Sequence, residues 1–234
     1  MIAWDDYART YDLMAKHNPA YQELLAIFAN VAADWPLPEG EQIIEIGAGT
    51  GNFAIRAAEL HPRAVVVHSE PEPAMQQHAR DKAEERGFGN MCFTASHAED
   101  AEFAAETFSG AVLVHVLYTL PAPHEFLCKL HRWMRRGAPV FACDLGRTLD
   151  VAEWRRYLVG EMLRTSGWWK TLCLLWRGRG VARANRAIAA AQRSGRYWIH
   201  DASTFAAAFR EAGFTVERQS TAYRGYSDLI VARA

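Results

Sequence analysis

The strongest constraint on this chain is a glycine-rich segment at residues 45–53, which follows the apolar pair Ile43-Ile44 and reads Glu-Ile-Gly-Ala-Gly-Thr-Gly-Asn-Phe. The pattern predicts a buried strand, a tight turn and a helix that begins near Asn52. Glycines stand at three alternate positions: Gly47, Gly49 and Gly51. They permit the turn and carry no Cβ that would hold a ligand away from the backbone. Because the helix start offers unpaired N–H groups, we expect a nucleotide-like cofactor across this turn.

An acidic residue follows the next predicted strand. The short β-branched run 64–68 ends at Ser69-Glu70-Pro71, which places Glu70 19 residues after Gly51. In an open α/β sheet an acid at this position accepts hydrogen bonds from ribose hydroxyls. We therefore predict that Glu70 holds a ribose, the alternative being a solvated loop acid.

Two cofactor patterns overlap in the turn. Gly49-x-Gly51-x-x-Ala54 fits the dinucleotide fingerprint for NAD or FAD. Glu45-x-Gly47-x-Gly49-x-Gly51 resembles motif I of the class I S-adenosylmethionine (SAM)-dependent methyltransferases. In that family the turn faces the methionine part of SAM, and no pyrophosphate is present.

Further segments resemble the methyltransferase family. About 40 residues precede the motif, whereas dinucleotide domains often open with theirs. Residues 92–100 resemble a third strand with the adenine-contacting turn, and 111–117 resemble the fourth strand, whose end faces the methyl group. Ala212-Gly-Phe214, a strand and then 223–233 resemble the antiparallel hairpin that closes the methyltransferase sheet.

The order of the predicted elements gives the fold class. Strands that alternate with helices indicate a mostly parallel sheet with helices on both faces. By resemblance this is a Rossmann-like class I methyltransferase α/β fold, with a seven-stranded sheet in the order 3-2-1-4-5-7-6 and an antiparallel C-terminal hairpin. The predicted strands are 42–46, 64–68, 91–95, 110–116, 140–144, 214–219 and 225–232, and the predicted helices are 3–15, 20–34, 52–60, 72–86, 123–135 and 201–212.

Length and composition agree with one catalytic domain over residues 1–234. A chain of this length with 50% hydrophobic residues can bury an ample core. A net charge of −1 gives no global attraction to nucleic acid, and four separated cysteines without a CxxC pair favour core positions in a reducing compartment over a zinc site. The N-terminus lacks a signal-peptide pattern, and no run approaches roughly 18 apolar residues. We expect a cytoplasmic protein without metal, nucleic-acid partner or integral membrane segment; peripheral membrane contact and oligomer formation stay open.

Residues 147–198 form an insertion after the fifth strand that the resemblance hardly covers. They contain eleven Lys or Arg and three acids, a net charge of +8 in a chain whose total is −1. Within them, Trp168–Trp176 is almost continuously apolar. This run is too short to span a bilayer, but it suits the wall of a lipophilic pocket or an interfacial patch flanked by Arg177 and Arg179. We predict a helical lid over the substrate, the alternative being a helical subdomain that packs on the sheet.

The resemblance implies a set of cofactor contacts. The glycine turn lines the methionine portion with Glu45 as its support, Glu70 holds the ribose, and Met75 packs on the adenine. Because the family often has Asp where this chain has His97, the adenine amino group is left to His97 or Glu99. The helices of residues 1–40 are expected to lie over the cofactor. The implied SAM-binding residues are Tyr7, Glu45, Gly47, Ala48, Gly49, Gly51, Glu70, Pro71, Met75, His97, Ala98, Glu99 and His115.

The reaction needs a nucleophile aligned with the S–CH3 bond of SAM, and it can also need a base. His115, at the end of the fourth predicted strand, is a candidate base, the alternative being a packed strand histidine. Tyr118 follows on the same loop. Tyr11 shares a helix face with Tyr7, where aromatic rings can attract the sulfonium or simply anchor the helix. The candidate substrate contacts are Trp168, Trp169, Tyr197, Tyr223 and Arg224.

The predicted function is transfer of the SAM methyl group to a small molecule, with S-adenosylhomocysteine (SAH) as the product. We expect a lipophilic or aromatic acceptor from secondary metabolism, and an acidic group on it would be held by arginines of the insertion. Three alternatives stay open. They are an enzyme of the same fold that cleaves or cyclises SAM, an NAD(P)-dependent oxidoreductase, and a non-catalytic SAM-binding partner protein. The closing hairpin counts against the oxidoreductase.

Overall fold

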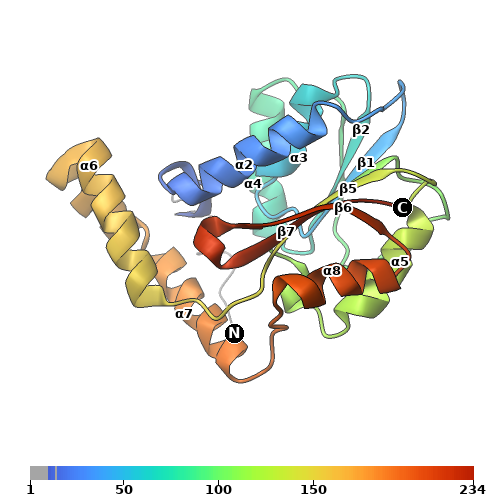
Figure 1. Ribbon diagram of the computed structural model, residues 1–234. Coiled ribbons are helices and arrows are strands. Elements are labelled where there is room, and N and C mark those ends of the chain that lie inside the picture. Colours follow the sequence, from blue (N-terminus) through green and yellow to red (C-terminus); the bar gives the residue numbers. More distant parts are fainter. Residues whose placement is uncertain (1–9, 14) are drawn as a thin grey trace.

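The computed structural model describes residues 10–13 and 15–234 (Figure 1). Residues 10–13 and 15–16 are helical. The longer helices are α2 (Pro19–Ala32), α3 (Asn52–Leu60), α4 (Pro73–Glu85), α5 (Pro123–Trp133), α6 (Val151–Arg177), α7 (Arg179–Arg193) and α8 (Ala202–Glu211). The strands are β1 (Gln42–Ile46), β2 (Val65–Ser69), β3 (Met91–Thr94), β4 (Gly110–Val114), β5 (Pro139–Leu145), β6 (Thr215–Ala222) and β7 (Ser227–Arg233). Two short 3-10 turns are η1 (Leu117–Thr119) and η2 (Tyr223–Gly225).

The seven strands form one sheet in the order β3-β2-β1-β4-β5-β7-β6, which confirms the predicted order. β1 lies in the interior, where Ile44 pairs in parallel with Val67 of β2 and Ala111 of β4. Only the two pairings that involve β7 are antiparallel, with β5 and with β6. The carboxyl ends of β1, β2, β4 and β5 therefore meet at one edge of the sheet, where ligands of open α/β sheets bind.

Helices cover both faces of the sheet (Figure 1). Neighbouring residues of β1 point to opposite faces, as the period of a strand requires. Ile43 packs in one cluster with Phe28 of α2 and Phe53 of α3. Ile44 packs in another with side chains of α5 and α8, among them Trp133. β1 is thus buried on both sides, which explains why the adjacent residues Ile43 and Ile44 are both apolar.

Two of the predicted strands lose residues at one end for a backbone reason. The predicted strand 110–116 ends at Val114 because His115 has a φ of 54°. The predicted strand 225–232 begins at Ser227 because it follows the turn η2, in which Tyr223, Arg224 and Gly225 have φ values of 53°, 59° and 82°. Such left-handed residues cannot continue a strand, and for non-glycine residues they are uncommon. Both irregular segments lie beside the cavity described below, where backbone strain is often found.

The insertion at 147–198 is largely helical, as predicted. Leu149, Trp154 and Ile188 pack with Tyr118 and Leu145 at the carboxyl ends of β4 and β5. α6 changes direction at Gly167, whose φ of 73° and ψ of 169° are not helical. Figure 1 shows the far end of α6 extending away from the sheet. The near part of the insertion therefore belongs to the site, and the far part projects outward.

Candidate active site

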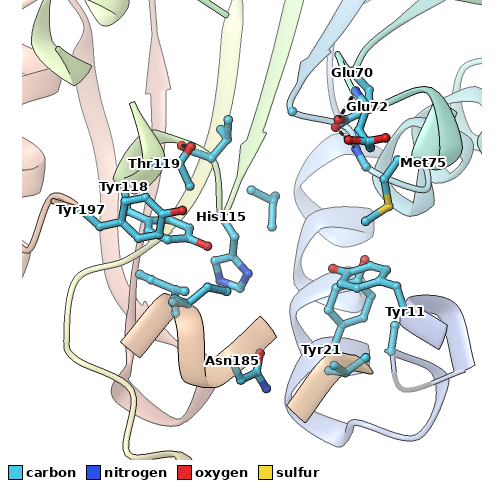
Figure 2. A pocket seen from close by; sticks show the side chains of 18 of the residues that line it. Tyr11, Tyr21, Glu70, Glu72, Met75, His115, Tyr118, Thr119, Asn185 and Tyr197 are labelled. Atoms are coloured by element: carbon cyan, nitrogen blue, oxygen red, sulfur yellow. Dashed lines mark hydrogen bonds between the residues drawn. The ribbon is translucent and has the colours of Figure 1, made fainter. Parts of the chain in front are cut away.

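A cavity of about 520 Å³ lies at the carboxyl edge of the sheet (Figure 2). It extends from the glycine turn after β1 to the inserted helices α6 and α7. Its volume falls in the range of sites for small molecules and cofactors. One end is lined by polar groups near the glycine turn, and the other by apolar side chains of the insertion: Leu149, Val151, Trp154, Leu158, Val181 and Ile188.

The glycine turn forms one wall of the cavity, and its three glycines serve different purposes. All three have positive φ values between 54° and 78°. A Cβ on Gly47 would lie 2.5 Å from Val116, and one on Gly51 would lie 2.9 Å from the Cβ of Ala79. Within the part of the chain that the structure describes, a Cβ on Gly49 would meet no atom within 4 Å beyond its chain neighbours. Packing thus requires glycine at 47 and 51, whereas at Gly49 the absent side chain leaves cavity space for a ligand.

Glu70 holds the turn in place from the end of β2. Its carboxylate accepts hydrogen bonds from the backbone N–H of Gly49 at 2.8 Å and of Glu72 at 3.0 Å (Figure 2). Burial raises the pKa of this carboxyl group, against the effect of those two bonds. His68 completes the arrangement, since its Nε2 lies 3.0 Å from the carbonyl oxygen of Gly49. Glu70 therefore faces the cavity with oxygens that can accept further hydrogen bonds from hydroxyl groups.

Glu45 supports the turn from below, as the resemblance implies. The carboxyl group is buried and accepts a 2.6 Å hydrogen bond from the backbone N–H of Ala54, in the first turn of α3. Burial raises the pKa of Glu45 to about 8. Below that pH the carboxyl group carries its proton and acts as a neutral acceptor for the helix N-terminus. Glu45 does not line the cavity, so its role is to position the turn.

Glu45→Ala is expected to lower the free energy of unfolding by about 1–3 kcal/mol, because the buried N–H of Ala54 loses its acceptor. Glu45→Gln should cost much less, since an amide is nearly isosteric with the protonated carboxyl and keeps a carbonyl oxygen. Urea denaturation of the three proteins at neutral pH measures both differences. Equal losses in the two variants would contradict the assigned hydrogen bond.

The N-terminal helix is tied to the glycine turn by a polar network. Asp12 accepts a 2.6 Å hydrogen bond from Thr50 and a 3.0 Å bond from Asn52, and it pairs with Lys82 at 2.7 Å. This places Tyr11 against the cavity. Figure 2 shows Tyr11 and Tyr21 facing the cavity from the side opposite His115. The expectation that N-terminal residues cover the cofactor stays a prediction, and this network supports it.

His115 lies at the junction between the two ends of the cavity (Figure 2). Its Nε2 is 3.0 Å from the hydroxyl oxygen of Ser227, and its ring meets Tyr223 edge-on at 4.8 Å. Burial lowers the pKa of His115 to about 4, so the imidazole is neutral at physiological pH. If Nε2 donates to Ser227, the lone pair of Nδ1 is left to accept a proton. His115 thus has the protonation state of a general base.

The cavity brings together most of the residues that the sequence singles out. Those that line it are Tyr11, Gly47, Gly49, Glu70, Pro71, Met75, His97, Ala98, Glu99, His115, Tyr118, Tyr197 and Tyr223. Glu45, Ala48 and Gly51 stand behind the wall of the turn and do not line the cavity. Tyr7 lies outside the described residues.

Three predicted substrate contacts lie outside the cavity, so its lining does not support them. Trp168 and Trp169 do not line the cavity, because they follow the change of direction at Gly167 and are 62% and 64% exposed. Arg224 also lies outside the lining. Its guanidinium pairs with Glu153 of α6 at 2.5 Å and covers the ring of Tyr157, with 4.0 Å between the guanidinium carbon and the ring centroid. Arg224 therefore links the β6–β7 hairpin to α6.

Several lining residues escape the sequence analysis. Asn18 caps α2 through a 3.1 Å bond from the N–H of Ala20, and it donates to the hydroxyl of Tyr223 at 2.8 Å. An Asn before a proline is a helix-start signal, so its capping role can be read from the sequence, but its contact with Tyr223 cannot. Trp154 and Ile188 lie in helices whose packing against the strand ends no local pattern reveals.

Comparisons with known proteins agree with this geometry. A family model described as a methyltransferase domain matches residues 14–219. The chain belongs to this methyltransferase domain family. The sheet agrees, since a dinucleotide-binding sheet has the strand order 3-2-1-4-5-6, whereas here the antiparallel β7 lies between β5 and β6. The resemblance to class I SAM-dependent methyltransferases is confirmed, and SAM is the cofactor of that class.

Individual relatives are distant. The ubiquinone/menaquinone biosynthesis C-methyltransferase UbiE of Sinorhizobium fredii is 27% identical over 140 residues, covering 58% of this chain and 54% of that protein. A SAM-dependent methyltransferase from Aquifex aeolicus has a similar fold, with a TM-score of 0.63, 15% identity and coverage of 96% and 97% of the two chains. The cyclase SpnF also shares the fold, with a TM-score of 0.59, 14% identity and coverage of 88% and 79%.

Three findings bound the functional conclusion. The chain spans about half the length of the curated relatives it matches, 54% of one and 48% of another. Among the described residues no group of three or more His, Cys, Asp or Glu side chains could hold a metal ion. A search of the same residues finds no helix with the length and apolar character needed to cross a membrane.

Proposed function

We propose that this chain transfers the methyl group of SAM to a neutral, lipophilic small molecule. The observation that carries the proposal is the continuity of the cavity. The glycine turn and Glu70 stand at one end, apolar side chains of α6 and α7 stand at the other, and His115 lies between them. A cofactor and an acceptor can therefore meet in one space at the base candidate.

The lining of the acceptor end indicates the chemistry of the substrate. The described lining residues include no Lys or Arg. The expectation of an acidic group held by arginines of the insertion therefore finds no support at the cavity, because a buried anion needs a cation or several donors. What the cavity offers is aliphatic surface together with hydroxyl, imidazole and amide groups, from Tyr118, Tyr197, His115 and Asn185. Such a lining fits a phenol or another aromatic acceptor with few polar atoms.

The names of similar proteins support the lipophilic character of the acceptor. The relative from Sinorhizobium fredii is named for the biosynthesis of ubiquinone and menaquinone. A structural neighbour of TM-score 0.59 is named a geranyl diphosphate methyltransferase, and the apolar part of that acceptor fits the lining here, whereas its anionic part does not. Neither name establishes the acceptor of this chain. Analysis of the methylated product would show whether an oxygen or a carbon atom accepts the methyl group.

Each part of the site would have a separate role in binding or in the reaction. Glu70 would hold ribose hydroxyls, the turn at Gly47 and Gly49 would lie against the methionine part of SAM, and His97 and Glu99 would lie near the adenine. When bound, SAM supplies a methyl group already activated by its sulfonium. The chain must then orient the acceptor and exclude water, which the apolar wall around Trp154 can do. His115 would remove the proton of the acceptor as its nucleophile forms.

Calorimetry with SAM, SAH, NAD and NADP tests the cofactor, and a panel of phenolic and quinol-like acceptors followed by mass spectrometry tests the reaction. We expect binding of SAM and SAH only, together with SAH and a methylated product. Release of methylthioadenosine would instead indicate cleavage of SAM. Binding of a dinucleotide alone would overturn the proposal at its first step.

A further inference from the structure

The far part of α6 carries a group of exposed aromatic and aliphatic side chains, here named the tryptophan face. Its members are Trp168, Trp169, Leu172 and Trp176, which are 62%, 64%, 56% and 64% exposed. The rings of Trp168 and Trp169 stack at 4.2 Å. Large apolar side chains clustered in this way mark a surface that meets an apolar environment.

The four side chains share one side of the helix. They lie one, four and eight residues along from the first, which at 3.6 residues per turn is an arc of about 100°. The opposite side is used for packing within the chain, since Leu174 is buried and clusters with Met162, Leu13 and Val181. Gly167 sets the direction of this part of α6, because its positive φ separates it from the part that lines the cavity. The tryptophan face therefore points outward because the opposite side of the same helix packs against the rest of the chain.

The surroundings of the face are strongly basic. Residues 162–200 contain eight Lys or Arg and no Asp or Glu. Lys170, Arg177 and Arg179 are exposed next to the face, and the guanidinium of Arg179 covers the ring of Trp176, with 4.6 Å between the guanidinium carbon and the ring centroid. An apolar stripe with Trp on one side and cations around it is the arrangement of helices that lie in a lipid–water interface.

We propose that the tryptophan face docks this protein on an anionic lipid surface. Indole rings suit the interface, since they combine a large apolar area with one N–H donor, and each nearby cation is attracted by anionic headgroups. A second copy of this chain is the less favourable occupant, because it would bring two basic segments without a single acid into contact. The stripe is too short to span a bilayer, so the contact is peripheral.

Docking would also explain how an apolar acceptor reaches the cavity. Trp154 and Leu158, on the near part of α6, and Val181 and Ile188, on α7, line the acceptor end of the cavity. The same helical hairpin therefore carries both the lipid-facing surface and the acceptor wall. A substrate dissolved in the bilayer could enter without crossing water. This consequence rests on the proposed function, whereas the docking itself does not.

Vesicle co-sedimentation tests the proposal with the full chain and without any acceptor. The probes are vesicles of phosphatidylcholine alone and of phosphatidylcholine mixed with phosphatidylglycerol. We expect binding to the anionic vesicles and little to the neutral ones. The double variant Trp168→Ala/Trp169→Ala should reduce the partition coefficient at least roughly tenfold. Lys170→Gln and Arg177→Gln should each reduce it about fivefold on anionic vesicles.

Two matched controls separate the tryptophan face from general surface effects. Ile199→Ala removes an exposed apolar side chain outside the face, and Arg210→Gln removes an exposed cation on α8. Both should bind vesicles like the unmodified chain. SAM calorimetry and circular dichroism on the same samples should be unchanged in every variant, because none of these residues lines the cavity.

The outcomes distinguish docking from the proposed function. Vesicle binding that needs the tryptophans supports docking, whether or not methylation is found. Absence of binding to anionic vesicles, or binding that the double variant retains, overturns it and leaves the SAM result standing. A concentration-dependent dimer that the double variant abolishes, without vesicle binding, would assign the face to a contact between copies and would also overturn docking.

Discussion

Gly49→Val is expected to weaken SAM binding at least roughly a hundredfold, about 2.7 kcal/mol, while the protein keeps its fold. The positive φ of 54° adds backbone strain to the variant. No atom of the described residues other than its chain neighbours lies within 4 Å of a Cβ at this position, so the new side chain occupies cavity space without disturbing the core. The valine side chain would stand where the methionine part of SAM is expected, beside the backbone N–H that donates a hydrogen bond to Glu70. Calorimetry measures the affinity, and urea denaturation confirms the folded state.

Gly40→Val is the matched control for that experiment. Gly40 has a φ of 80°, no atom lies within 4 Å of its Cβ position, and it does not line the cavity. The variant carries similar backbone strain, so both variants should lose stability. If only Gly49→Val also loses SAM affinity, that loss comes from the steric effect of the valine side chain in the cavity and not from backbone strain. Unchanged SAM affinity in folded Gly49→Val would mean that the cofactor does not lie on the turn.

His115→Ala is expected to lower kcat by about a hundredfold or more, within the range of general acid–base effects. SAM affinity should fall much less than in Gly49→Val, since most of the expected cofactor contacts come from the glycine turn and Glu70, whereas His115 lies at the junction with the acceptor end. Tyr118→Phe, which keeps the ring and removes only the hydroxyl, is the rival test for the base. A large loss of kcat in Tyr118→Phe and none in His115→Ala would transfer the role to Tyr118.

The pH dependence of the same residue follows from its lowered pKa. The base is lost when the imidazole takes up a proton, so the acidic limb of the rate should lie near pH 4 rather than near 6.5. The free energy of unfolding should change with pH in the same direction, because it also falls when His115 takes up a proton. Between pH 6.5 and 4 the unfolded chain binds a proton at His115 that the folded chain does not. The contribution of His115 to the free energy of unfolding is therefore fully present above pH 6.5 and is lost as the pH drops towards 4. His115→Ala should make this decline shallower in acid titrations followed by circular dichroism.

Much of the cofactor end of the site could be predicted from the sequence. The turn and the helix that starts at Asn52 are local structures, because glycine spacing and the positions of strand and helix signals decide them within a few residues. The start of α8 is local in the same way, since its N-cap Asp201 accepts from the N–H of Thr204 at 2.7 Å. The strand order followed from resemblance, and the sheet confirms it.

The acceptor end was decided by tertiary structure alone. The sequence favours Trp168 and Trp169 as part of the cavity wall, but the change of direction of α6 at Gly167 turns them outward. Arg224 is drawn to Glu153, 71 residues away, rather than to the cavity. Asp12 likewise reaches Thr50 and Lys82, from segments that no local pattern connects. Periodicity shows that a side chain needs a partner, but which remote surface supplies it depends on how the helices and the sheet pack, and only the folded structure contains that information.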